Sequence, residues 1–158
     1  MINNLDSKII NGNMNYNLSL KNWINPSRKI KAELLYRLSE NGDKFSTFHE
    51  LCDNKGPTLT LFHVKDGNKV GIYTPLSWDI ISGWKNDMET FIFNLNKNQK
   101  YKKLQPDSSA LCNNSNGPCT FGFGYNFTNS MTTINIMLIA LMNIMIEVQK
   151  FYKVIIKQ

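Results

Sequence analysis

A β-hairpin is the feature that most restricts the fold of this chain. Two short runs with high strand propensity, residues 58–62 and 69–73, flank the tetrapeptide Lys-Asp-Gly-Asn at 65–68. The Asp-Gly pair can supply the positive φ angles of a tight turn. Because an isolated pair of strands is only marginally stable in water, further strands must complete the sheet. The hairpin therefore predicts a β-rich domain.

Other segments can supply those strands. Short runs of strand-forming residues occur at 33–38, 90–95, 101–104, 110–113 and 120–127. Glycine, proline and asparagine punctuate them, as is typical of turns and bulges between short strands. This pattern predicts a sandwich of two antiparallel sheets.

Two short helices are expected beside the strands. Four apolar residues of the first helix recur at helical spacing and share one face: Tyr16, Leu20, Trp23 and Ile24. Pro26 ends this helix. The second helix is expected at about residues 46–52.

The length of 158 residues fits a single domain over residues 1–158. We expect the α+β class, as a two-sheet antiparallel β-sandwich with a few short flanking helices. The residues predicted to lie inside are Leu34, Leu35, Phe48, Leu59, Leu61, Ile72, Trp78, Phe91 and Phe93.

Several motifs keep a common order and spacing along the chain. They are ELLYRLS at 33–39, FH at 48–49, CDNKGPTLTL at 52–61, GIYT at 71–74, SWD at 77–79, FIFNL at 91–95, GP at 117–118 and FG at 121–122. Together they resemble the TLDc domain of the oxidation-resistance proteins, over about residues 5–127. The resemblance implies a non-catalytic protein-interaction domain linked to oxidative-stress protection. It also implies a protein partner, since several members bind the vacuolar proton-pumping ATPase. We accordingly expect no enzyme activity and no cofactor.

A thiol alternative comes from His49 and Cys52, which lie at i, i+3 on the second expected helix. This spacing permits a thiolate–imidazole contact, with Asp53 adjacent. The pair is the candidate redox site for peroxide reduction or sensing. Zinc binding by these residues with Cys112 and Cys119 is disfavoured, because the six residues between the two later cysteines exceed the usual knuckle spacing.

The formal charge of +6 is concentrated in residues 95–158, which carry seven lysines against two acidic residues. The candidate partner-binding cluster is Lys97, Lys100, Lys102 and Lys103. It contains no arginine to pair with bases or phosphates in bidentate fashion, so we expect no nucleic-acid partner.

The C-terminal part departs from the family pattern. Residues 131–148 form an apolar run that is expected to be an atypical helix, and only 147–148 or 151–155 remain as a last strand. The sandwich is therefore expected to be incomplete at this end, and a truncated, inactive copy is a further alternative. The run at 134–146 is shorter than the roughly 20 residues of a membrane span, so any membrane association is expected to be peripheral. The N-terminal residues show no secretory signal, which predicts a cytoplasmic location.

Overall fold

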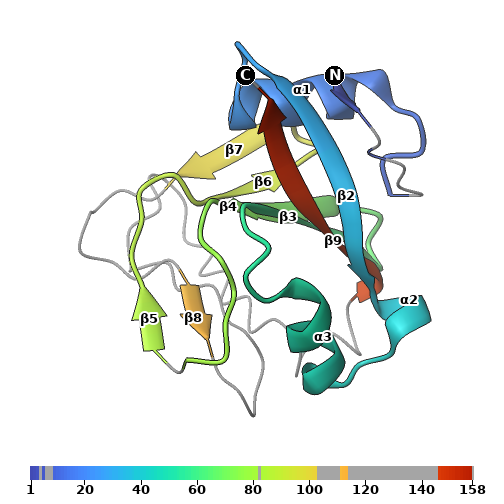
Figure 1. Cartoon of the computed structure of the whole chain (residues 1–158). Coiled ribbons are helices and arrows are strands. Elements are labelled where there is room, and N and C mark those ends of the chain that lie inside the picture. Colours follow the sequence, from blue (N-terminus) through green and yellow to red (C-terminus); the bar gives the residue numbers. More distant parts are fainter. Residues whose placement is uncertain (4, 6–8, 82, 103–110, 114–145, 158) are drawn as a thin grey trace.

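The computed structural model describes residues 1–3, 5, 9–81, 83–102, 111–113 and 146–157, with the backbone alone at 84, 111–113, 146–153 and 157 (Figure 1). The strands are β1 (Ile2–Asn3), β2 (Lys29–Arg37), β3 (Thr58–Val64), β4 (Lys69–Thr74), β5 (Gly83–Lys85), β6 (Phe91–Asn94), β7 (Gln99–Lys102), β8 (Leu111–Asn113) and β9 (Ile146–Lys157). The helices are α1 (Met14–Ile24), α2 (Leu38–Asn41) and α3 (Phe45–Cys52).

The strands form two sheets of unequal size. Seven strands make one sheet, in the order β1-β2-β9-β3-β4-β6-β7, and β5 pairs with β8 in the other. Every pair among the described strands is antiparallel except β1 with β2. The predicted α+β fold, with two antiparallel-rich sheets and a few short helices, is confirmed.

The predicted hairpin is formed by β3 and β4, which pair from Thr58 opposite Thr74 to His63 opposite Lys69. In the turn that joins the two strands, the side chain of Asp66 accepts a hydrogen bond from the backbone N–H of Asn68 at 2.8 Å. Gly67 has a φ of 86°, a conformation that glycine adopts at no steric cost. The turn residues and the register of the strand pairs therefore both support the predicted hairpin.

The strand β9 lies in the interior of the larger sheet, between β2 and β3 (Figure 1). Residues 150–153 of β9 pair with both neighbours, so that Lys153 lies opposite Glu33 on one side and Thr58 on the other. The terminal segment that the sequence offered as a last strand thus forms β9. The predicted apolar helix is wrong for residues 146–148, which belong to this strand, and residues 131–145 lie outside the described residues. Backbone pairing with His63 and Val64 of β3 favours the strand there.

Apolar side chains are buried on both faces of the larger sheet. On one face, Leu20 of α1 packs with Leu59, Leu61 and Phe93. Three further residues of α1 pack against this cluster, as predicted: Tyr16, Trp23 and Ile24. α1 thus covers this face with the side that the sequence pattern predicted.

The other face carries a second cluster, in which Phe62 and Ile72 lie with Phe48 of α3. The ring of Trp78 lies edge-on to Phe48, with 5.4 Å between centroids. α1 and α3 therefore cover opposite faces of the sheet.

Most of the predicted core is confirmed. The buried members are Phe48, Leu59, Leu61, Ile72, Trp78, Phe91 and Phe93, while Leu35 packs at the edge of the α3 cluster. Leu34 is 38% exposed, so its predicted burial is wrong. Alternation puts it on the face of Ile30 and Ala32, but it lies beyond the part of β2 that pairs with β1 and just before a β-bulge. No helix in the described part of the chain has the length and apolar character needed to cross a membrane.

Candidate functional site

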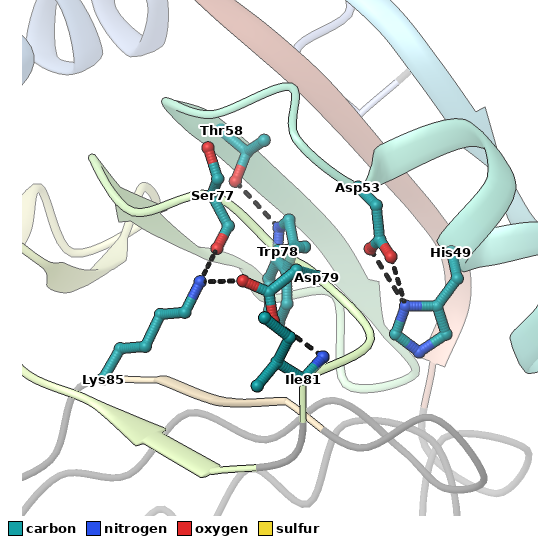
Figure 2. Close-up of polar contacts among 8 residues, drawn as sticks. All are labelled: His49, Asp53, Thr58, Ser77, Trp78, Asp79, Ile81 and Lys85. Atoms are coloured by element: carbon teal, nitrogen blue, oxygen red, sulfur yellow. Dashed lines mark hydrogen bonds and ion pairs between the residues drawn. The ribbon is translucent and has the colours of Figure 1, made fainter.

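Two of the motifs that carry the family resemblance, CDNKGPTLTL and SWD, come together where α3 ends and where the chain leaves the sheet after β4 (Figure 2). The GP and FG motifs at 117–118 and 121–122 lie outside the described residues. Asp53 and Trp78 form an isolated parallel β-bridge, and the backbone N–H of Asn54 donates to the carbonyl of Trp78 at 2.9 Å. We term the two segments that meet there, residues 49–58 and 74–79, the motif junction. The junction is a backbone-paired joint rather than an open loop.

Trp78 fixes the junction to the sheet. Its side chain is fully buried, and its indole N–H donates to the hydroxyl of Thr58 at 3.1 Å. A buried indole N–H needs such an acceptor, because it is otherwise stripped of water without compensation. The SWD motif therefore contributes a buried core residue, Trp78, to the sheet face that α3 covers.

Gly56 is required by close packing within the junction. A Cβ atom at this position would lie 2.6 Å from the carbonyl oxygen of Leu76 and 2.9 Å from the Cα atom of Ser77. Pro57 follows through a cis peptide bond, and its carbonyl accepts a hydrogen bond from the N–H of Val154 at 2.8 Å. Gly56 and Pro57 thus bring the two motif segments and β9 together.

Lys85 of β5 binds the segment of the junction that contains the SWD motif. Its ammonium group donates to the carbonyl of Ser77 at 2.9 Å and forms an ion pair with the carboxylate of Asp79 (Figure 2). That carboxylate also accepts the backbone N–H of Ile81 at 3.0 Å. Sequence reasoning did not single out Lys85, since a contact between a loop residue and a strand residue leaves no periodic signal.

The candidate redox residues lie at the end of α3. The Nδ1 atom of His49 lies 2.9 and 3.1 Å from the two carboxylate oxygens of Asp53, one helical turn later (Figure 2). Cys52 is 0% exposed and belongs to the cluster under α3. Because the thiol is fully buried, a peroxide molecule in solvent has no direct access to it in this conformation. The nearby Tyr36 is also affected by its surroundings: burial raises its pKa to about 12, and the charges of Cys52 and Asp43 add to this effect.

The zinc hypothesis finds no support in the described residues. Within that part of the chain, no three side chains of the ligand types His, Cys, Asp and Glu gather at one point. Cys112 is described only as backbone in β8, and Cys119 lies outside the described residues.

The predicted lysine cluster is not one free surface. Lys97 and Lys102 are exposed, and Lys103 lies outside the described residues. Lys100 instead donates to the carbonyl of Trp23 at 2.7 Å, and its Nζ atom lies 3.9 Å from the centroid of the Phe91 ring. Burial, and then the charge of Lys102, lower the pKa of Lys100 to about 8. Lys100 therefore ties β7 to the end of α1.

Comparison with protein families gives a clear relationship. A family model for the TLDc domain matches residues 3–148, which extends well beyond the motifs at 33–122. A search of curated proteins gives no match. The family match spans most of the chain and includes the whole motif junction. The chain therefore belongs to the TLDc domain family, which is generally linked to oxidative stress.

Proposed function

We propose that this chain is a non-catalytic protein-interaction domain that contributes to oxidative-stress protection by binding the vacuolar proton-pumping ATPase. One observation carries the non-catalytic part of the proposal: the side chains of Trp78 and His49, in the motif junction, are engaged in internal contacts. Trp78 is buried and bonded to Thr58, and His49 is 7% exposed and paired with Asp53. Side chains held in this way serve to position the surrounding surface.

The burial of Cys52 weighs against direct thiol chemistry. A reactive cysteine is normally accessible and lies in surroundings that favour its thiolate. Cys52 is surrounded instead by the apolar cluster of Phe48, Phe62 and Trp78. Any protective effect is therefore expected to act through a partner.

The partner is tested with purified components. The full chain, immobilised as bait, is incubated with the purified cytosolic sector of the proton-pumping ATPase, and retention is measured against an unrelated β-rich bait. Retention of the sector is expected. A folded bait that retains none of it would contradict the proposed partner.

The non-catalytic role is tested in cells challenged with peroxide. Cys52→Ala removes the buried thiol at a modest cost in packing, so the variant should protect cells as well as the wild type when both are present in equal amounts. A folded Cys52→Ala variant that no longer protects would show that the thiol takes part.

A further inference from the structure

The first half of β2 and the facing end of β9, which α3 does not cover, carry a row of cross-strand pairs rich in lysine. The register pairs Lys29 with Lys157, Lys31 with Ile155, and Glu33 with Lys153. We term these positions the basic strand face. Directly paired residues share one face of an antiparallel sheet. Four lysines and one glutamate are thus collected within a few residues of two neighbouring strands.

The alternate residues of the same strands show that this face points away from the α1 core. Ile30, Ala32 and Val154 are buried in the cluster under α1. By contrast, Lys29 and Glu33 are exposed. Strand alternation therefore places Lys29, Lys31 and Glu33 on the opposite side of the sheet from α1.

That opposite side is covered only farther along the strands. Tyr36 and Phe48 are buried together there, with ring centroids 5.7 Å apart. In Figure 1, α3 lies at the lower end of β2 and β9, whereas the residues at the start of β2 lie at the upper end. Lys31 and Ile155, in the middle of the row, are only half-buried. Among the described elements, none packs over this row, whereas α3 packs over the adjoining part of the same sheet face.

The charges on this face do not balance one another. Like charges placed directly opposite across two strands are unfavourable, and Lys29 opposite Lys157 is such a pair. Glu33 is the single acidic residue in the three paired positions, against four lysines. A surface of this kind gains free energy when a negatively charged partner approaches.

We propose that the basic strand face binds an acidic segment of a protein partner. Residues two apart on one strand are separated by about 7 Å, and cross-strand partners by about 5 Å. Carboxylates on one side of a helix or an extended segment have similar spacings. This inference rests on the proposed interaction function and names the chemistry of the contact.

A protein segment fits this face better than a lipid or nucleic-acid surface does. Glu33 would repel a continuous layer of phosphates, whereas a protein can place a basic or neutral group opposite it. Ile155 adds an apolar position among the charges, as is usual within protein–protein contacts. The row itself holds no arginine, the residue best suited to bidentate phosphate contacts.

The test uses two variants of the full chain with the same change in charge. Lys29→Glu/Lys31→Glu alters the basic strand face, and Lys97→Glu/Lys102→Glu alters exposed lysines at the β6–β7 turn and on β7. Binding of a fluorescein-labelled decaglutamate peptide is measured by fluorescence anisotropy, with a decaglutamine peptide as control. Matching circular dichroism spectra and melting temperatures establish that each variant is folded.

We expect the first variant to weaken decaglutamate binding by about tenfold or more, and the second by less than about threefold. Equal losses in the two variants, or no binding by the wild type, would overturn the proposal. So would sedimentation with phosphatidylserine vesicles that depends on Lys29 and Lys31 while decaglutamate binding does not.

Retention of the purified ATPase sector separates this inference from the proposed function. If the wild type and the Lys29→Glu/Lys31→Glu variant retain it equally, the proposed partner stands and the basic strand face is not its binding surface. If decaglutamate binding depends on this face but the sector is not retained, the inference stands and the proposed partner is wrong.

Discussion

The indole of Trp78 and the hydroxyl of Thr58 meet in a hydrogen bond of 3.1 Å, although 20 positions separate the two residues in the chain. Both side chains are buried, so neither group can exchange this bond for one with water. The contact joins the SWD motif to the first strand of the hairpin. It therefore gives a direct test of whether the motif junction stabilises the fold.

Thr58→Val should lower the free energy of unfolding by about 1–3 kcal/mol, because it leaves the Trp78 N–H buried without its acceptor. Thr60→Val is the matched control. Thr60 is also 1% exposed on β3, but its hydroxyl has no hydrogen-bond partner among the described residues. This second substitution should be neutral or stabilising. Urea unfolding measures both, and equal losses would contradict the role assigned to the bond.

Gly56→Ala should destabilise the protein by roughly 2 kcal/mol or more, because the new Cβ atom would overlap the backbone of Leu76 and Ser77. Gly42→Ala provides the comparison. Gly42 has open space around its Cβ position, but its φ of 74° and ψ of −174° lie in a region that is essentially restricted to glycine, so backbone strain of about 1–3 kcal/mol is expected without steric overlap. Thermal unfolding of both variants compares a loss from steric overlap with a loss from backbone strain. A loss below about 1 kcal/mol for Gly56→Ala would show that the junction can open to admit a methyl group.

Lys100 should make stability depend on pH in the alkaline range. Its pKa is lowered from 10.5 to about 8 in the folded protein, so the unfolded chain binds more protons between these values. The contribution of Lys100 to stability therefore rises as the pH increases from about 8 towards 10.5. Melting temperatures of the wild type and Lys100→Met, compared from pH 7.5 to 9.5, should show a rise that the variant lacks. Parallel curves for the two proteins would contradict this.

Cys52 should react with a thiol reagent only when the protein unfolds. In a Cys112→Ser/Cys119→Ser background, Cys52 is the remaining cysteine, and it is fully buried. Labelling in native buffer should be far slower than labelling in urea. Rapid labelling of the folded protein at or below about pH 7.5 would instead reveal an accessible, activated thiol and revive the peroxide hypothesis.

Local patterns predicted much of the fold correctly. The hairpin of β3 and β4 follows from turn residues that lie next to one another in sequence. The helix α1 follows from apolar spacing on one face and from the proline after it. His49, Cys52 and Asp53 could be placed on or next to one short helix for the same reason. Such elements depend on neighbours a few residues away.

Features that depend on remote partners were not predicted. The apolar run extends into Ile146–Val148, and only pairing with β3, more than eighty positions earlier, makes these residues strand. The exposure of Leu34 depends on where β1 stops pairing with β2. Lys100 resembles a surface lysine in sequence, but the end of α1 lies over it and accepts its hydrogen bond. Each outcome depends on tertiary packing, which no local pattern records.

The interior position of β9 also affects how the protein matures during synthesis. β2 and β3 are both complete by Val64, yet the strand that joins them begins at Ile146. At the usual rate of translation, the ribosome needs roughly 4 to 16 s to cover that distance. During this interval two strand edges in the middle of the future sheet have no partner of their own, and such edges are where nascent chains associate wrongly. The nascent chain is therefore expected to depend on chaperones until residues 146–157 emerge.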